Sequence, residues 1–334
     1  MDRIEKLVRG WADNSLTSLN IQIGHLEKRL YRTYEPNKFR DGDFWERLAH
    51  WLNNVSSDEE KQTLFRLIPE LLYVGPTEIE ELYRSAYEGP IKRWLIDLEN
   101  IDICAPDAND QLANIASTTW FCPVTDSLRI NAFYHINNLS AGADLRPDWC
   151  SLHQLGDINR INSYCQVHGI TRLVLLEDFV GGGSQSLGAV EFAANNLRGV
   201  KVLFAPLMIC PTGAENARVL AENLCKTRPD ALRYDPVLEL QKEAFLTPGN
   251  DPFTQQDGFA RKLHAVIDTT YPKVSGGLPQ GPKKPYHPYG YPSSCPTGGL
   301  LVMYSNTPDN TLPLIHWRPS TKSWYPIFPR HSRV

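Results

Sequence analysis

The sequence predicts an α/β fold with a parallel sheet, preceded by an N-terminal α-helical region. Three observations predict this class. Apolar residues recur with helical spacing in the first part of the chain, apolar runs alternate with helical segments after about residue 115, and one apolar run leads directly into a glycine-rich turn. We therefore expect a helical region over residues 1–105 and an α/β domain over residues 106–334.

The N-terminal region shows helical spacing from its first turn. Ile4, Leu7, Val8 and Trp11 recur at i, i+3, i+4 and i+7, which places them on one face of a helix. Further along, Ser57 and Glu60 have the spacing of a capping box. The tryptophans of this region are either core anchors or part of a surface that binds a protein partner. They are Trp11, Trp45, Trp51 and Trp94.

The second part of the chain alternates between short apolar runs and helical patterns. We expect strands at residues 118–122, 173–176, 200–209 and 299–304, and helices at residues 151–168, 186–197 and 214–225. Strands that are apolar on both faces are typical of a parallel sheet covered by helices on both sides.

The composition excludes several classes of function. The formal net charge of −4 gives no global field that would attract nucleic acid or an anionic membrane. No run approaches the roughly 18 apolar residues that a transmembrane helix needs, and the N-terminus has no apolar signal core. The seven cysteines are scattered without a CxxC pair. We expect a cytoplasmic protein that does not bind membranes.

An acidic pair and a glycine loop follow the apolar run at residues 173–176. Glu177 and Asp178 come first, two apolar residues follow, and then come three glycines, at 181–183. A strand delivers such acids to the carboxyl edge of the sheet, where α/β folds bind ligands. Glycines let backbone N–H groups approach a phosphate without obstruction by Cβ, and the next helix directs its positive end toward it.

Two adjacent carboxylates would repel a bare phosphate, so we expect them to face another part of the ligand. Ribose hydroxyls suit Glu177 and Asp178, either directly or through Mg²⁺. A phosphate cradle beside acids that bind a diol describes a site for ribose 5-phosphate. The alternative is a tight turn between strand and helix, whose acids cap the helix or lie in water. The loop has neither the Walker pattern nor the G-x-G-x-x-G order of a dinucleotide site.

The run from Leu173 to Gln185 resembles the phosphoribosyl pyrophosphate signature of type I phosphoribosyltransferases. The resemblance implies a phosphoribosyltransferase-like core in which Glu177 and Asp178 are the catalytic acids and contact the ribose, with Asp178 as a candidate Mg²⁺ ligand. The loop departs from the usual pattern, since glycines replace hydroxyl residues at its first two positions and Gln185 stands where Thr or Arg is common. The residues expected to hold the 5′-phosphate are Gly181, Gly182, Gly183, Ser184 and Gln185.

The same resemblance points to the loop after the first core strand, which binds pyrophosphate in type I phosphoribosyltransferases. Here Thr125 and Ser127 follow that strand and offer hydroxyl donors. The alternative is an ordinary turn between a strand and a loop.

The C-terminal part resembles the tail of a phosphoribosyltransferase-like family of bacterial conflict systems, on residues 304–313 and 324–330. In that family the acidic pair is likewise followed by Phe-Val-Gly. The resemblance implies a role in anti-phage defence, beside components such as a retron reverse transcriptase. Within the tail, Asn306 and Asn310 either bind a base or ribose, contact the glycine loop from a neighbouring strand, or satisfy their own turn.

Three functions follow as hypotheses. The first is an enzyme that binds phosphoribosyl pyrophosphate or a nucleotide with Mg²⁺ and transfers a group or cleaves an N-glycosidic bond at the ribose anomeric carbon. The second is a non-catalytic module that senses a nucleotide and signals to a partner through the helical region. The third is binding of nucleic acid through the loop that carries Lys283 and Lys284.

Overall fold

The computed structural model describes residues 2–11, 13–36, 42–139, 157–253, 258–276, 287–291 and 297–331. The chain forms two compact units. Unit 1 comprises Met1–Pro76 and Gln241–Val334, and unit 2 comprises Thr77–Leu240. Unit 2 is therefore an insertion in the chain of unit 1. These boundaries differ from the expected division after residue 105, because the chain beyond residue 240 packs with the N-terminal helices. Lys283 and Lys284 lie outside the described residues.

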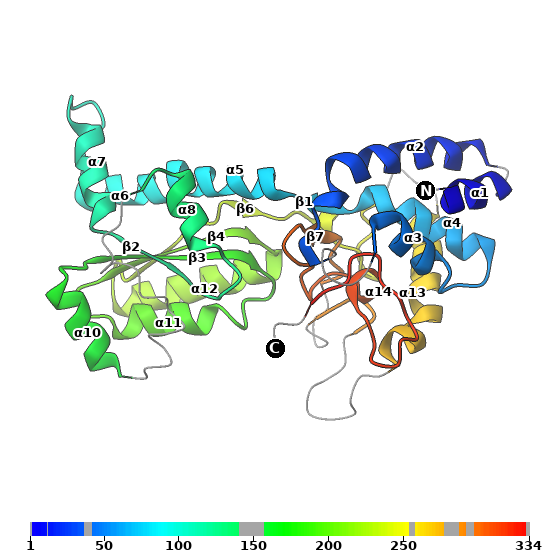
Figure 1. The fold of residues 1–334 in the computed structure, drawn as a ribbon. Helices are drawn as coiled ribbons and strands as arrows, with labels where there is room; N and C mark the ends of the chain where they lie inside the picture. The colour runs from blue at the N-terminus through cyan, green and yellow to red at the C-terminus, as the bar shows by residue number, and fades with distance from the viewer. Residues whose placement is uncertain are drawn as a thin grey trace. The chain divides into compact units, whose positions relative to one another are not determined.

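Unit 1 is mainly helical and contains one small sheet (Figure 1). Its helices are α1 (Asp2–Gly10), α2 (Asn14–Arg29), α3 (Phe44–Leu52), α4 (Asp58–Leu67), α13 (Phe259–Ser275) and α14 (Pro313–His316), with 3₁₀ turns at Tyr31–Thr33, Ile68–Glu70 and Lys242–Ala244. The two strands, β1 (Leu72–Val74) and β7 (Leu301–Met303), pair in parallel. Strand β1, which has only three residues, was not among the strands expected from the sequence.

The expected helical pattern at the N-terminus is present. Ile4 and Val8 are buried on α1. The capping box predicted from Ser57 and Glu60 is confirmed, since Ser57 Oγ accepts from Glu60 N at 3.2 Å and Ser57 N donates to Glu60 Oε2 at 3.1 Å. These bonds satisfy amide groups that would otherwise have no partner at the start of α4.

The core of unit 1 joins segments that are far apart in the sequence. Trp51 Nε1 on α3 donates to the Leu314 carbonyl at 2.8 Å, and the buried Tyr34 hydroxyl donates to the Pro329 carbonyl at the same distance. Trp51 is fully buried and Trp11 is nearly so, which supports the core role for these two side chains. The C-terminal tail therefore packs against the N-terminal helices.

Unit 2 holds the parallel sheet predicted from the sequence. Its strands are β2 (Trp120–Pro123), β3 (Arg172–Val180), β4 (Lys201–Ile209), β5 (Leu232–Tyr234) and β6 (Leu238–Glu239). The order is β2-β3-β4-β5, with β6 also paired to β4, and every pairing is parallel. Strand β4 is buried along nearly its whole length, as expected for a sheet covered on both faces.

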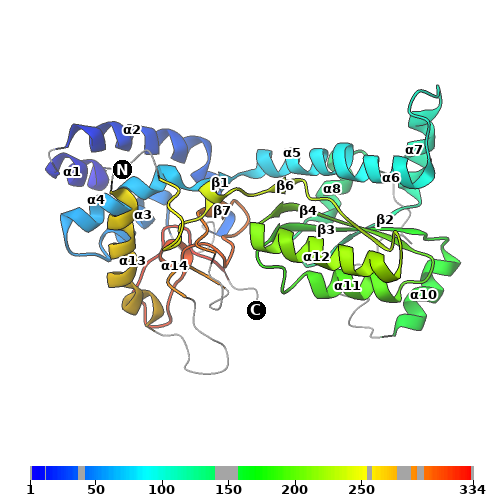
Figure 2. The ribbon, with the colours of Figure 1, turned by 180° about the vertical axis from the view of Figure 1, so that it is seen from behind.

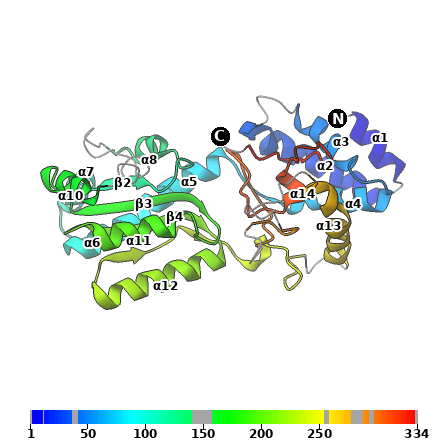
Figure 3. The same cartoon turned by 90° about the horizontal axis from the view of Figure 1, so that it is seen from below.

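Helices cover both faces of this sheet. The helices of this unit are α5 (Pro76–Ala86), α6 (Lys92–Glu99), α7 (Ala108–Ser117), α8 (Ile130–Ile136), α10 (Ile158–Val167), α11 (Leu187–Asn196) and α12 (Pro211–Thr227), and a π-helical turn, Tyr87–Ile91, joins α5 to α6. Figures 1 and 2 show α11 and α12 on one face and α5 and α6 on the other, and Figure 3 shows α11 beside α12. No helix in the described ranges is both long and apolar enough to span a membrane.

The register of β3 decides where the acidic pair lies. The strand is longer than expected and continues through both acids to Val180. Its pairing with β2 ends at Leu176, whereas its pairing with β4 continues through Glu177 to Val180. The acids therefore lie where β3 extends beyond β2, at the carboxyl edge of the sheet.

Candidate functional site

The loop after β2 is bonded to the first acid of the pair. Thr125 donates to the Glu177 carboxylate twice, from its backbone N to Oε2 at 3.0 Å and from its hydroxyl to Oε1 at 2.6 Å. The arrangement follows from the register, because Thr125 comes two residues after the last β2 position that pairs with β3. The carboxylate thereby holds the start of this loop.

The second acid is bonded to the same loop. The Ser127 hydroxyl donates to Asp178 Oδ1 at 2.7 Å, and it lies 2.7 Å from the Thr125 hydroxyl. Asp178 Oδ1 also accepts from the backbone N of Phe179 at 2.9 Å. The structure thus brings together four of the residues predicted for the site. The two hydroxyls expected to face a pyrophosphate are used here as partners of the carboxylates.

Burial changes the protonation of Glu177. Its side chain is only 5% exposed. Loss of hydration and the neighbouring Asp178 charge raise the pKa of Glu177 to about 8, against the hydrogen bonds from Thr125 and Ser127, which act to lower it. A shift of this kind at a sheet edge that faces a loop is a feature of functional sites.

The three loop glycines direct their carbonyl groups at the protein. The Gly181 carbonyl oxygen faces Gly213 on α12 so closely that a Cβ atom there would overlap with it. The Gly182 carbonyl accepts from Asn216 Nδ2 at 3.0 Å. The Gly183 carbonyl accepts two bonds from the start of α11, at 3.2 Å and 2.8 Å. The Gly181 and Gly182 carbonyl groups therefore face α12, and the Gly183 carbonyl is bonded to the start of α11.

The N–H groups of the same peptides point the other way. In a trans peptide the N–H is antiparallel to the C=O, so the amides after these carbonyls face away from the helices that hold them. Within the described residues, no hydrogen bond uses the backbone N–H of residues 181–185 as a donor. Gly183 has φ +87°, a conformation that permits such a turn of consecutive amides. The loop therefore offers amide donors to a ligand.

The last two residues of the loop, Ser184 and Gln185, are less tightly packed than the glycines. Ser184 and Gln185 are exposed, and α11 begins two residues later, at Leu187. The free donors thus stand beside the positive end of a ten-residue helix. A Cβ atom on Gly182 would meet no atom within 4 Å, so the space next to this residue is open.

Sequence reasoning missed Gly213 and Asn216, which hold the loop from α12. A signal was present: Pro211 comes two residues after the end of the apolar β4 strand and starts a helix. Because β4 is the neighbour of β3, the helices after both strands begin at the same edge of the sheet, and α12 had to meet the glycine loop.

The two asparagines predicted from the tail lie in unit 1. Asn306 donates to the His331 carbonyl at 2.9 Å and accepts from two backbone amides, and Asn310 donates to the Tyr291 carbonyl at 2.8 Å. Strand β7, which precedes them, pairs with β1 and not with β3. The expected placement of these residues after a strand next to β3 is therefore wrong. A role in ligand binding stays a prediction.

The donor set suits a hard cation only in part. The acidic pair supplies carboxylate oxygens, the ligands that Mg²⁺ prefers. The described residues contain no group of three or more His, Cys, Asp or Glu side chains placed to hold a metal ion. A Mg²⁺ ion at Asp178 would need further oxygens from a ligand and from water.

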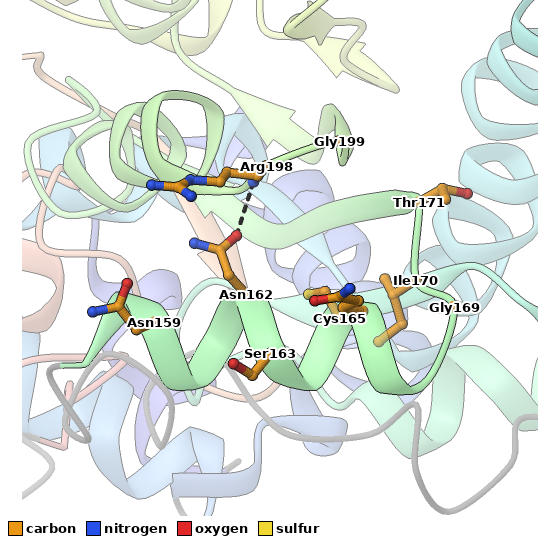
Figure 4. A pocket seen from close by; sticks show the side chains of 10 residues that line it. Asn159, Asn162, Ser163, Cys165, Gly169, Ile170, Thr171, Arg198 and Gly199 are labelled. Atoms are coloured by element: carbon orange, nitrogen blue, oxygen red, sulfur yellow. Dashed lines mark hydrogen bonds between the residues drawn. The ribbon is translucent and has the colours of Figure 1, made fainter.

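A cavity of about 520 Å³ lies at the opposite edge of the same sheet (Figure 4). It is lined by α10 and by the turns that lead into β3 and β4. Asn162 Oδ1 accepts there from the backbone N of Arg198 at 2.8 Å. None of the lining residues carries a carboxylate, so this cavity is distinct from the acidic pair.

Comparison with protein families identifies the family of the chain. A family model described as PRTase-CE matches residues 48–330, which is well over half of the 334 residues. The matched range includes the acidic pair, the loop after β2, the glycine loop and the tail. No curated protein and no solved structure matches the chain.

Proposed function

Because the chain belongs to the PRTase-CE family of phosphoribosyltransferase-like proteins, we propose that the carboxyl edge of its five-stranded sheet binds a ribose 5-phosphate group. The ligand would be phosphoribosyl pyrophosphate or a nucleotide. One observation carries the proposal: the glycine loop turns three carbonyls toward helices, and its amide donors have no acceptor among the described residues, beside an acidic pair.

The parts of the site would have separate tasks. The amides of residues 182–184 would bind the 5′-phosphate, helped by the positive end of α11. Asp178 would meet the ribose diol, and Mg²⁺ where the ligand carries a diphosphate. When bound there, Mg²⁺ would neutralise charge on a leaving pyrophosphate. Glu177 would fix the loop that carries Thr125 and Ser127, since it is already bonded to that loop.

With these tasks the reaction would be transfer of a group, or cleavage of an N-glycosidic bond, at the ribose anomeric carbon. Such a reaction depends mostly on position and on electrostatic stabilisation, because little covalent assistance is needed. We propose that the activity serves bacterial anti-phage defence, as the family resemblance implies.

One observation favours a second function, a non-catalytic nucleotide sensor. The Thr125 and Ser127 hydroxyls face the carboxylates in the structure, so the groups expected to bind a leaving pyrophosphate are engaged. A sensor would bind the nucleotide at the same loop, and binding would change its interaction with a protein partner.

Calorimetric titration tests the proposal, with ribose 5-phosphate compared against ribose. We expect ribose 5-phosphate to bind more tightly than ribose. Labelled phosphoribosyl pyrophosphate, NAD and nucleotides, incubated with wild type and Asp178→Asn, then separate the two functions. Turnover that is lost in Asp178→Asn supports the enzyme, and binding without turnover supports the sensor. Equal affinity for ribose and ribose 5-phosphate would refute both.

A further inference from the structure

Asn216 is the side chain on α12 that contacts the glycine loop by a hydrogen bond. It lies near the start of a 17-residue helix, and its Nδ2 donates across 34 positions of sequence to the Gly182 carbonyl at 3.0 Å. The bond is exposed, so it adds little to the stability of unit 2. Its main effect is on the geometry of the loop.

The bond fixes the rotation of one peptide plane. The carbonyl of Gly182 and the N–H of Gly183 belong to the same trans peptide and point in opposite directions. A carbonyl held by Asn216 therefore turns the Gly183 N–H away from α12. A glycine on each side of this plane leaves the rotation otherwise weakly restricted, since neither residue has a Cβ.

Gly213 acts on the preceding peptide in the same sense. It lies one helical turn before Asn216, and the absence of a side chain lets the Gly181 carbonyl approach the helix. The N–H of Gly182 is thereby also turned away from α12. The first turns of α12 thus set two consecutive amides of the loop.

We propose that Asn216 and Gly213 are positioning residues that orient the Gly182 and Gly183 amides toward the phosphate of the ligand. The proposal rests on the proposed function, since it gives these residues a task only if the loop binds a phosphate. It assigns part of the phosphate specificity to α12, which is separated from the loop in the chain by α11 and β4.

The test uses the full chain with Asn216→Ala and a matched control, Asn223→Ala. Asn223 lies two turns further along α12, is exposed, and has a side-chain contact to Lys226. The affinities for ribose 5-phosphate and for 5′-AMP are compared with those for ribose and adenosine. We expect Asn216→Ala to weaken binding of the phosphorylated ligands about tenfold, which is the effect of one poorly aligned hydrogen bond to a charged group. Ligands without phosphate, and Asn223→Ala with any ligand, should show no change.

A spectroscopic readout separates orientation from a general loss of structure. With ¹⁵N-glycine labelling, ribose 5-phosphate should shift the Gly182 and Gly183 amide signals in wild type, and these shifts should shrink in Asn216→Ala while the other glycine signals stay in place. Gly213→Ala, which pushes a methyl group against the Gly181 carbonyl, should act in the same direction.

The outcomes distinguish the two proposals. If wild type binds ribose 5-phosphate no better than ribose, both the proposed function and this inference fail. If wild type prefers the phosphorylated sugar and Asn216→Ala keeps that preference, the inference alone is overturned. A loss that is equal for phosphorylated and unphosphorylated ligands would also overturn it, since it would indicate a merely structural role.

Discussion

The Thr125 hydroxyl donates a 2.6 Å hydrogen bond to the carboxylate of Glu177, a side chain that is only 5% exposed. The bond joins the loop after β2 to the neighbouring strand β3 at the point where the pairing of the two strands has ended. Since a buried carboxylate without donors is costly, this contact stabilises both the loop and the acid. It therefore gives a direct way to test the site.

Thr125→Val replaces the hydroxyl with a methyl group of similar size and leaves a buried carboxylate oxygen with fewer donors. We expect the free energy of unfolding to fall by about 1–3 kcal/mol, the cost of an unsatisfied buried group. Urea denaturation followed by far-UV circular dichroism measures the change. Thr125→Ser keeps the hydroxyl and should remain within about 1 kcal/mol of wild type. Equal stability of Thr125→Val and Thr125→Ser would contradict the assignment of this bond.

Glu177→Gln should change how stability depends on pH. The folded-state pKa of Glu177 lies above its ordinary value of 4.5, so the stability that the neutral acid contributes is fully present below pH 4.5 and is lost as the pH rises toward 8. Glutamine stays neutral throughout. The stability of Glu177→Gln relative to wild type should therefore rise between pH 5 and pH 8, by at most about 1.4 kcal/mol per pH unit.

The second acid supplies the control for this measurement. Asp178→Asn removes the neighbouring charge that helps to raise the pKa of Glu177. When Glu177→Gln is compared with its parent in the Asp178→Asn background, the rise in relative stability should therefore end at a lower pH. A flat difference between Glu177→Gln and wild type from pH 5 to pH 8 would show that Glu177 is ionised in the folded protein throughout that range.

Gly183→Ala should destabilise unit 2, whereas Gly182→Ala should not. Gly183 has φ +87°, and a Cβ atom there would lie 2.6 Å from the Leu187 side chain. We expect a loss of about 1–3 kcal/mol, typical of a strained left-handed position. Gly182 has open space at the same place, so its alanine variant should fold normally and obstruct the ligand instead. Thermal denaturation with and without ribose 5-phosphate distinguishes the two effects; similar melting temperatures for both unliganded variants would argue against the loop geometry.

The buried side chain of His316 should make unit 1 less stable in acid. It is fully buried, it contacts the Thr311 carbonyl through Nε2 at 3.1 Å, and burial lowers the pKa of His316 to about 3. The stability it provides is present above the unfolded pKa of about 6.5 and is lost as the pH falls. Between pH 6.5 and pH 5 the free energy of unfolding should fall by about 2 kcal/mol from this residue. His316→Gln should remove that part of the slope, and His25→Gln, on the exposed side of α2, should leave it unchanged.

Much of unit 2 could be predicted because its elements are long and their apolar patterns are strong. The strand over residues 173–176, the helix over residues 186–197 and the parallel sheet were each found where expected, and the match to the PRTase-CE model confirms the predicted family. The strand continues through the acids because Phe179 and Val180 can pair with β4, which a sequence pattern does not reveal.

The parts that could not be predicted depend on contacts between distant segments. The return of the chain to unit 1 after residue 240 has no local signal, since it rests on bonds such as that from Trp51 to Leu314. The position of Asn310 in a separate unit follows from that return. Likewise, Asn216 is an ordinary helical residue in the sequence, and its bond to Gly182 depends on the order of two neighbouring strands.

The inserted position of unit 2 has a consequence for synthesis of the chain. Leu72 in β1 finds its pairing partner only at Leu301, so a ribosome must release all of unit 2 before unit 1 can close. The five-stranded sheet of unit 2 can form first, while the N-terminal helices of unit 1 still have exposed apolar faces. A chain stopped shortly after residue 240 would then hold a folded unit 2 and an incomplete unit 1 with exposed apolar surface, which is a natural substrate for chaperones and proteases.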